Sequence, residues 1–333
     1  MKKLYICCTY YHLLISIIKS LKSDDECDLF LSTTWHDFTL IHDILLIKKL
    51  KESNIFSNVI VDNNFIQDRE KIVNSDIKEI KKFFIMKKIK KFFPLKLTDY
   101  DEIYLFSYNN PTGRIVNKSK IYHNLLEDGM DCYKNNQVII KSKLTLKNFI
   151  KKFVLKLDDL GESKYTKSIE VNDKNGIKIK NKKIIEVSKK KMFEELSKKE
   201  KNLIFSLFIS NDKWKTLNDA SLILTQPFYE DDILNSKSKQ INIYKDIINE
   251  FCINDNVVIK PHPRDHTDYK SIISPANIID DIFPLEILNF VNIKFNKVIT
   301  VSSTSINLIY NCNKKIVLGW DWLDKKVKEY EGK

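Results

Sequence analysis

The chain has 333 residues, 43% of them hydrophobic and 11% aromatic, which is enough for buried cores and excludes a globally disordered protein. At about 100–200 residues per domain, this length predicts two domains. The 56 Lys and Arg residues outnumber the 44 Asp and Glu residues by 12, a surplus that favours anionic partners such as phosphates, nucleic acid or an acidic membrane surface.

The first twenty residues, MKKLYICCTYYHLLISIIKS, combine a charged start with many apolar side chains. Polar and aromatic residues interrupt the apolar run and no small-residue cleavage site follows, so we do not expect a signal peptide. No run of about 18 apolar residues occurs, which excludes a membrane-spanning helix. The cysteines form no C-x-x-C pair, so we expect a cytoplasmic protein with buried thiols at Cys7, Cys8, Cys27, Cys132, Cys252 and Cys312.

The first half of the chain alternates apolar strands with amphipathic helices. Such alternation is typical of a parallel, doubly wound sheet. The segment from about 165 to 215 is rich in lysine and weakly periodic, and we place a domain boundary at its end. The pattern predicts helices at 10–22 and 38–53, and strands at 2–9, 27–33, 56–62, 101–107 and 120–129.

Two stretches, at 79–96 and 146–157, interleave lysines with Phe, Ile and Leu at helical spacing. Basic amphipathic helices of this kind lie in the interface of a bilayer, where each lysine near anionic head groups contributes roughly 1 kcal/mol. The alternative is a lysine-edged helix that packs its apolar face on the sheet. We therefore predict peripheral contact with the inner face of an anionic membrane, with sheet packing as the alternative.

The second half repeats the alternation, with a helix expected at 240–252 and strands expected at 221–227, 256–263, 297–305 and 314–320. Two Rossmann-like halves in one α/β chain predict a GT-B-like architecture, with domains at 1–215 and 216–333 facing a cleft. In open α/β sheets ligands bind outside the carboxyl ends of the strands. The residues that follow each strand are therefore the candidates for function.

One such strand end, NVVIKPHPRD at 256–265, places a histidine between two prolines. Pro261 must end the strand because it has no N–H for the ladder, so His262 lies on a stiff loop. Lys260 before it and Arg264 after it make the loop cationic. Imidazole can donate a proton or a hydrogen bond to a phosphate oxygen, and arginine can bind that group through two N–H groups. We interpret His262 as a fixed cationic donor to a phosphate, although an ordinary loop histidine is the alternative.

A run of hydroxyl side chains follows the strand that begins at residue 297, and an apolar helical pattern comes after it. Hydroxyls and free backbone N–H groups at a helix start form an anion site. A plain N-cap would need a single hydroxyl, whereas four occur here. The run therefore predicts a phosphate site at Ser302, Ser303, Thr304 and Ser305.

Acidic side chains follow two other strands. In the first half, Glu127 and Asp128 precede Gly129 at a strand end, where a carboxylate could act as a general base. In the second half, Asp231 lies in an acidic run after the strand at 221–227, and this run could equally complement the dipole of a helix start.

In their order along the chain, these motifs resemble those of the bacterial sialyltransferases, most closely glycosyltransferase family 52, the lipooligosaccharide sialyltransferases. That family has an acidic-acidic-Gly motif in the first half, then an H-P motif and a serine/threonine motif in the second. The opening LYICCTYYHLLISI also looks like the first strand and helix of that family, and we expect a departure from the family pattern in the lack of an N-terminal membrane segment. The matching motifs here are Glu127-Asp128-Gly129, His262-Pro263 and Ser302-Ser303-Thr304.

The resemblance implies a GT-B-like fold and CMP-sialic acid as the donor, with inversion by direct displacement and no metal or other cofactor. It implies that His262 assists departure of the CMP phosphate and that Arg264 helps to neutralise it. In some bacterial sialyltransferase families the general base comes from the acidic-acidic-Gly motif, which implies Asp128 or Glu127, whereas in family 52 it follows the strand before the H-P motif, which implies Asp231 or a neighbour. Both remain open. The residues implied to hold the nucleotide are Lys260, His262, Pro263, Ser302, Ser303 and Thr304.

Three other functions are compatible with the sequence. A family 52 transferase could use another nucleotide sugar, and CDP-glycerol glycerophosphotransferases also have an H-P-R loop and a serine-rich loop. A basic protein could instead bind nucleic acid or membrane through its lysines, but no nucleic-acid module is recognisable, so nucleic acid is not an expected partner. The expected partners are a CMP-sugar donor, a glycan or glycolipid acceptor of lipooligosaccharide or capsule, an anionic membrane and a second copy in a homodimer.

Overall fold

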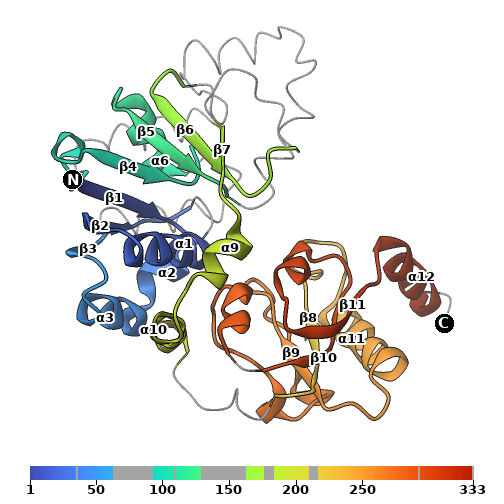
Figure 1. The fold of residues 1–333 in the computed structure, drawn as a ribbon. Helices are drawn as coiled ribbons and strands as arrows, with labels where there is room; N and C mark the ends of the chain where they lie inside the picture. The colour runs from blue at the N-terminus through green and yellow to red at the C-terminus, as the bar shows by residue number, and fades with distance from the viewer. Residues whose placement is uncertain are drawn as a thin grey trace, which may run out of the picture. The chain divides into compact units, whose positions relative to one another are not determined.

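The structure is a computed structural model in which contacts divide the chain into two compact units, Met1–Glu200 and Lys201–Lys333 (Figure 1). Each unit contains its own parallel β-sheet with helices, which is the α/β architecture of two Rossmann-like domains expected from the sequence. The domain boundary predicted from the sequence lies after residue 215, whereas the contacts divide the chain after Glu200. The predicted boundary stays a prediction. The residues that the structure describes are 1–34, 37–62, 93–108, 110–128, 163–175, 184–209, 217–291 and 293–331.

Unit 1 has, among its described residues, a sheet of seven parallel strands in the order β3-β2-β1-β4-β5-β6-β7. The strands are β1 (Lys2–Cys7), β2 (Glu26–Leu31), β3 (Asn58–Val61), β4 (Glu102–Leu105), β5 (His123–Leu126), β6 (Thr166–Val171) and β7 (Ile184–Glu186). The helices are α1 (Tyr10–Leu21), α2 (Thr39–His42), α3 (Ile44–Glu52), the 3-10 helix η1 (Leu97–Asp99), α6 (Pro111–Lys118) and α9 (Lys189–Glu194), and α10 (Lys198–Phe208) runs across the division between the units.

Unit 2 has a parallel sheet in the order β11-β10-β8-β9 among its described residues. The strands are β8 (Ser221–Leu224), β9 (Val257–Lys260), β10 (Phe295–Thr300) and β11 (Cys312–Val317). The helices are α11 (Lys237–Phe251) and α12 (Trp320–Glu331), with the 3-10 helices η5 (Tyr269–Ser271), η6 (Pro275–Asn277), η7 (Leu285–Phe290) and η8 (Thr304–Leu308).

Both sheets contain a point at which the strand order reverses, and this point positions the candidate sites. In unit 1 the chain leaves β1 toward β2 and later returns to β4 on the other side of β1. In unit 2 it leaves β8 toward β9 and returns to β10 on the other side of β8. Ligands of open parallel sheets bind at the carboxyl ends of the strands that flank such a point. We call the end of each sheet that is formed by the carboxyl ends of its strands the carboxyl edge.

The strands are apolar on both faces because a parallel sheet is covered on both sides. In unit 2, one face packs on α11 and α12, where Ile223, Ile259 and Ile299 of three neighbouring strands form one buried cluster with Tyr244 and Leu323. Successive side chains of a strand point to opposite faces. The residue after Ile259, which is Lys260, therefore points to the face that α11 and α12 do not cover.

The expected strands are confirmed, whereas the helices differ from the expectation at several points. The helix expected at 38–53 is divided at Asp43, whose carboxylate accepts a 3.0 Å hydrogen bond from the N–H of Leu46 and so begins a new helix, α3. The described residues of the weakly periodic segment at 165–215 form β6, β7, α9 and α10. After β10 the expected helix is the short 3-10 helix η8, and α12 was not predicted.

The described residues include only part of the segments and cysteines on which the membrane and cysteine predictions depend. The basic stretches at 79–96 and 146–157 lie outside the described residues, apart from 93–96. Within the part of the chain that the structure describes, none of the helices has the length and apolar character needed to cross a membrane. Of the cysteines described, Cys312 on β11 is only half-buried, against expectation, whereas the thiols predicted to be buried are so at Cys7, Cys8, Cys27 and Cys252.

Candidate active site

The H-P-R loop (residues 261–265) leaves the carboxyl end of β9 and is fixed by backbone hydrogen bonds. The N–H of His262 donates to Oγ1 of Thr225, which follows β8, over 3.1 Å. The N–H of Arg264 donates to Nδ1 of His262, also over 3.1 Å. Because Nδ1 accepts, the proton of a neutral imidazole is on Nε2, and Nε2 is the nitrogen that can donate to a ligand.

The charge state of this histidine depends on its surroundings. Burial is the main cause that lowers the pKa of His262 below its usual value, and the neighbouring Arg264 guanidinium lowers it further. A lowered pKa favours the neutral imidazole in the free loop, and the cationic donor stays a prediction for the loop with a phosphate bound. A phosphate beside the ring would raise this pKa again, because an opposite charge favours the protonated form.

A buried carboxylate that the sequence analysis did not select holds the loop in place. Asp265 accepts hydrogen bonds from the hydroxyls of Thr225 and Tyr269, the latter over 2.7 Å, and from the N–H of Thr267 over 3.0 Å. The amide of Gln240 donates to the same carboxylate over 2.8 Å. A buried carboxylate with this many donors is well satisfied, so the backbone around His262 has one defined conformation. Its position directly after H-P-R was the available sequence signal.

Gln240 also fixes the acidic loop that follows β8. Its side-chain oxygen accepts a 2.8 Å hydrogen bond from the N–H of Tyr229, two residues before Asp231. The Asp231 carboxylate forms a two-point ion pair with the Arg264 guanidinium, in which Nη2 lies 3.2 Å from Oδ2. The structure thus brings together two predicted site residues, Asp231 and Arg264, and pairs them with each other. Since their side chains are 34% and 60% exposed, the pair contributes only about 0–1 kcal/mol and can yield to an anionic ligand.

Lys260, the last residue of β9, is an unusual buried cation. Its Nζ donates to the carbonyl of Pro261 over 3.3 Å and lies 4.9 Å from the centre of the Phe283 ring. Among the described residues it forms no ion pair, and burial lowers its pKa to about 8, although Asp281 and Asp280 act in the opposite direction. A cation kept at the carboxyl edge without a paired carboxylate is suited to an anionic ligand.

The hydroxyl run after β10 is bound to the end of β8 by one side chain, that of Gln226. Its amide donates to Oγ of Ser302 over 2.6 Å, and its oxygen accepts from the N–H of Ser302 over 2.9 Å. The N–H of Ser303 donates to Oγ1 of Thr300 over 3.2 Å. Two N–H groups of the predicted anion site are therefore engaged within the protein, and η8, which Thr304 begins, is a 3-10 helix of five residues.

If this run binds a phosphate, its hydroxyl groups must do so, because the N–H groups of Ser302 and Ser303 are already engaged. Because Oγ of Ser302 accepts from Gln226, the hydrogen of the same hydroxyl can point toward a ligand. Ser302 follows β10 and His262 follows β9, so the two residues flank the end of β8 at the carboxyl edge of unit 2. Phosphate binding by Ser302, Ser303 and Thr304 stays a prediction.

In unit 1 the two predicted acidic residues after β5 have different environments. Glu127 is buried and accepts a hydrogen bond from the N–H of Asn172, directly after β6, so it joins two strand ends. Asp128 is half-exposed, and its Oδ1 lies 2.9 Å from Nε2 of His12. Gly129 lies outside the described residues. The sequence analysis missed His12, for which the signal was a histidine in the first turn after the first strand.

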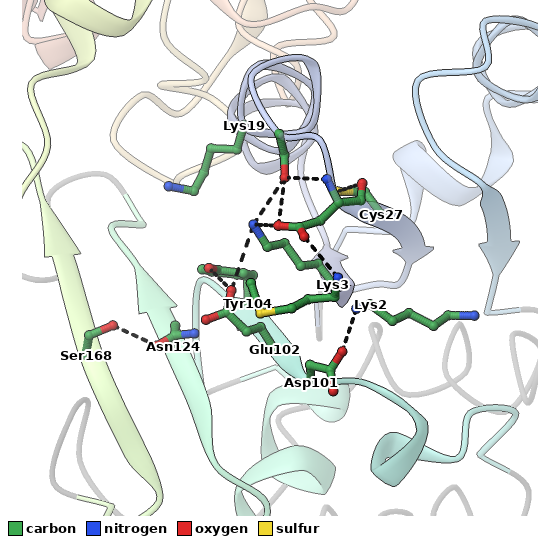
Figure 2. Close-up of polar contacts among 12 residues, drawn as sticks. Lys2, Lys3, Lys19, Cys27, Asp101, Glu102, Tyr104, Asn124 and Ser168 are labelled. Carbon is green, nitrogen blue, oxygen red and sulfur yellow. Dashed lines mark hydrogen bonds and ion pairs between the residues drawn. The ribbon is translucent and has the colours of Figure 1, made fainter.

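A pocket of about 280 Å³ in unit 1 is lined by residues of β1, α1 and β4, among them Tyr5 and Tyr104. Figure 2 shows its polar surroundings, which include the labelled Lys3 and Lys19. Hydrogen bonds from Lys3 and the chain's amino group lower the pKa of Asp25 to about 2. The pocket belongs to the salt-bridged scaffold, because its lysines are paired as Lys3–Asp25 (2.7 Å), Lys19–Glu170 (2.7 Å) and Lys22–Glu200 (2.9 Å).

Comparisons with known proteins bear on the family and the fold of the chain. The family model of glycosyltransferase family 52 matches residues 44–318. An uncharacterized protein of Haemophilus influenzae is 37% identical over 111 residues, a match that covers 33% of this chain and 36% of that protein. The match thus spans about a third of the length of this relative.

Two solved structures are similar in fold. The UDP-GlcNAc 2-epimerase of Methanocaldococcus jannaschii, in complex with UDP-GlcNAc and UDP, matches with a TM-score of 0.50 and 14% identity over 100% of this chain and 93% of that chain. The structure of MnaA with UDP from S. aureus gives a TM-score of 0.48 and 11% identity over 95% and 78%. The first likeness shows the fold class, which is GT-B-like with two Rossmann-like domains.

Proposed function

The chain belongs to glycosyltransferase family 52, and we propose that it is an inverting, metal-independent sialyltransferase that uses CMP-sialic acid. The acceptor in this proposal is a terminal galactose of a bacterial surface glycan, in lipooligosaccharide or capsule. The observation that carries the proposal is the H-P-R loop, in which Nδ1 of His262 is occupied and Nε2–H is the remaining donor. Lys260, Arg264 and the Ser302 hydroxyl gather at the same carboxyl edge, where a phosphate would need them.

The proposed reaction is a single displacement. The acceptor hydroxyl oxygen bonds to the anomeric carbon of sialic acid and gives its proton to a carboxylate of the enzyme. The bond from that carbon to the phosphate oxygen breaks, and CMP departs with the electron pair. His262 donates a hydrogen bond from Nε2–H to the departing phosphate, and Arg264 and Lys260 offset the charge of that phosphate. CMP has a single phosphate, so fixed donors and cations can supply the stabilisation that a metal gives a diphosphate.

The first test is CMP release from CMP-sialic acid with a lactose-type acceptor in the presence of EDTA. Wild type should turn over, and His262→Ala should lower the rate at least tenfold, which corresponds to about 1.4 kcal/mol of barrier. The matched control is His266→Ala, because His266 is an exposed histidine of the next turn whose backbone makes its hydrogen bonds, with the N–H donating to Glu230 and the carbonyl accepting from Lys237. We expect this variant to retain wild-type turnover.

Absence of both turnover and CMP binding in wild type would contradict the donor assignment. CDP-glycerol and other sugar nucleotides would then be the donors to test. Turnover that EDTA abolishes and added Mg²⁺ restores would contradict metal independence alone.

We also propose that the two basic stretches attach the enzyme to an anionic membrane, where its glycolipid acceptor would be found. The lysines at 79–96 and 146–157 motivate this proposal. We expect the protein to sediment with vesicles of phosphatidylcholine and phosphatidylglycerol at physiological salt, and not with phosphatidylcholine alone. Equal recovery in the supernatant with both kinds of vesicle would remove the membrane contact from the proposal.

A further inference from the structure

One hydroxyl at the carboxyl edge of unit 2 joins the H-P-R loop to the protein interior. Thr225 directly follows β8 and is only 3% exposed. Its Oγ1 accepts a 3.1 Å hydrogen bond from the N–H of His262 and donates its own hydrogen to the buried carboxylate of Asp265. The N–H of Thr225 donates to the carbonyl of Lys260 over 3.2 Å, so the pairing of β8 with β9 fixes where this hydroxyl lies.

Together these bonds close a ring around the histidine. The carbonyl of His262 accepts a 2.8 Å hydrogen bond from the N–H of Asp265, so the two residues are joined by a turn. In the same turn, Nδ1 of the imidazole accepts from the N–H of Arg264 over 3.1 Å. The backbone N–H, the backbone carbonyl and one ring nitrogen of His262 are thus all bound. Among the described residues, Nε2 is the one polar atom of His262 without a hydrogen-bond partner.

The carboxylate behind Thr225 is itself held by donors from the interior of unit 2. The amide of Gln240 on α11 donates to Oδ1 of Asp265 over 2.8 Å, and the hydroxyl of Tyr269 donates to Oδ2 over 2.7 Å. All three side chains are buried. A buried polar network whose members are all bonded has one defined arrangement. Asp265 therefore directs the hydrogen of the Thr225 hydroxyl toward itself, and a lone pair of that hydroxyl remains for the N–H of His262.

We propose that Thr225 is a positioning residue for His262 and that Asp265 acts through it, an inference that rests on the proposed function. Both side chains are more than nine-tenths buried, so they act through the histidine and not on the substrate. They transfer no proton. By fixing the backbone of His262 they direct its Nε2–H toward the departing phosphate. A donor that is oriented before the reaction stabilises the developing charge without a further cost of ordering.

The test compares two substitutions of Thr225. Thr225→Val has nearly the same shape but leaves the N–H of His262 without its acceptor, whereas Thr225→Ser keeps the hydroxyl. We expect Thr225→Val to lower kcat about tenfold and to change KM for the donor less than about twofold, because the contact matters most as the phosphate departs. Thr225→Ser should retain most of the wild-type kcat. In a His262→Ala background, Thr225→Val should cause no further loss, because the two residues act as one group.

Thr267→Val is the matched control. Thr267 is a buried threonine of the same network, and its Oγ1 accepts from the Gln240 amide over 2.9 Å. In the described part of the chain it forms no hydrogen bond with His262. This variant should lose stability but keep kcat within about twofold of wild type. If wild type turns over and Thr225→Val loses no more kcat than Thr267→Val, or if its effect adds to that of His262→Ala, the inference is overturned and the proposed function stands.

A second readout does not depend on turnover. Titration of the His262 ring by NMR, with and without CMP, measures how far the bound phosphate raises the pKa of this ring. We expect a clear rise in wild type and in Thr225→Ser, and a rise about half as large or smaller in Thr225→Val. An equal rise in Thr225→Val would overturn the inference alone. No rise in wild type, together with no CMP release from any donor, would overturn the proposed function and the positioning role with it.

Discussion

Asp231→Asn is expected to lower kcat by about 10²–10⁴-fold, the usual contribution of a positioned general base, without weakening the affinity for CMP. In the free loop the Asp231 carboxylate is paired with the Arg264 guanidinium, and this exposed pair can yield when the guanidinium binds the donor phosphate. The amide has nearly the same shape as the carboxylate, but it cannot take a proton from the acceptor hydroxyl. The measurement is steady-state turnover at saturating donor, with CMP affinity determined separately by calorimetry.

Asp128→Asn is the comparison that separates the two candidate bases. Oδ1 of Asp128 lies 2.9 Å from Nε2 of His12, and an amide oxygen can accept a hydrogen bond at the same place, so we expect less than a tenfold fall in kcat. The opposite ranking, with Asp128→Asn losing more kcat than Asp231→Asn, would assign the base to the acidic residues after β5. Equal and small effects of both variants would contradict carboxylate base catalysis at either residue.

The strand ends were predictable because their signals are local. Apolar runs identify buried strands, and Pro261 ends β9, so the positions of Lys260 and His262 at a sheet edge followed from neighbouring residues. The serine run after β10 was found in the same way. The hydrogen bonding of this run was not predictable, because its N–H groups are bound by Gln226 and Thr300. The 3-10 helix in place of an α-helix was not predictable either, because no local sequence pattern indicates it.

The pairings of the predicted site residues were not predictable, since they join residues far apart in the sequence. Asp231 and Arg264 are 33 positions apart, and His12 and Asp128 are 116 positions apart. Such pairs depend on which strands are neighbours, and the strand order of a sheet is not contained in the periodicity of a single segment. The short strand β7 escaped prediction for a related reason, because its three residues are too few to show a period.

The buried charge of Lys260 lowers the stability of the folded chain at neutral pH. One pKa unit corresponds to about 1.4 kcal/mol, so a pKa that burial lowers from 10.5 to about 8 indicates a cost of about 3 kcal/mol when both states are protonated. That cost is present in full below pH 8. Between pH 8 and 10.5 the unfolded chain binds more protons at this residue than the folded chain, so the stability of wild type rises with pH and the cost disappears.

Lys260→Met should therefore increase the free energy of unfolding by about 1–3 kcal/mol at pH 7, because methionine fills a similar volume without a charge. The advantage over wild type should shrink from pH 8 upward and vanish near pH 10.5. The same variant should bind CMP at least tenfold more weakly, since it removes a cation that has no paired carboxylate among the described residues. Urea unfolding at several pH values and calorimetry with CMP measure the two effects. A variant that is less stable than wild type at pH 7, or that binds CMP equally well, would show that Lys260 serves the fold and not the nucleotide.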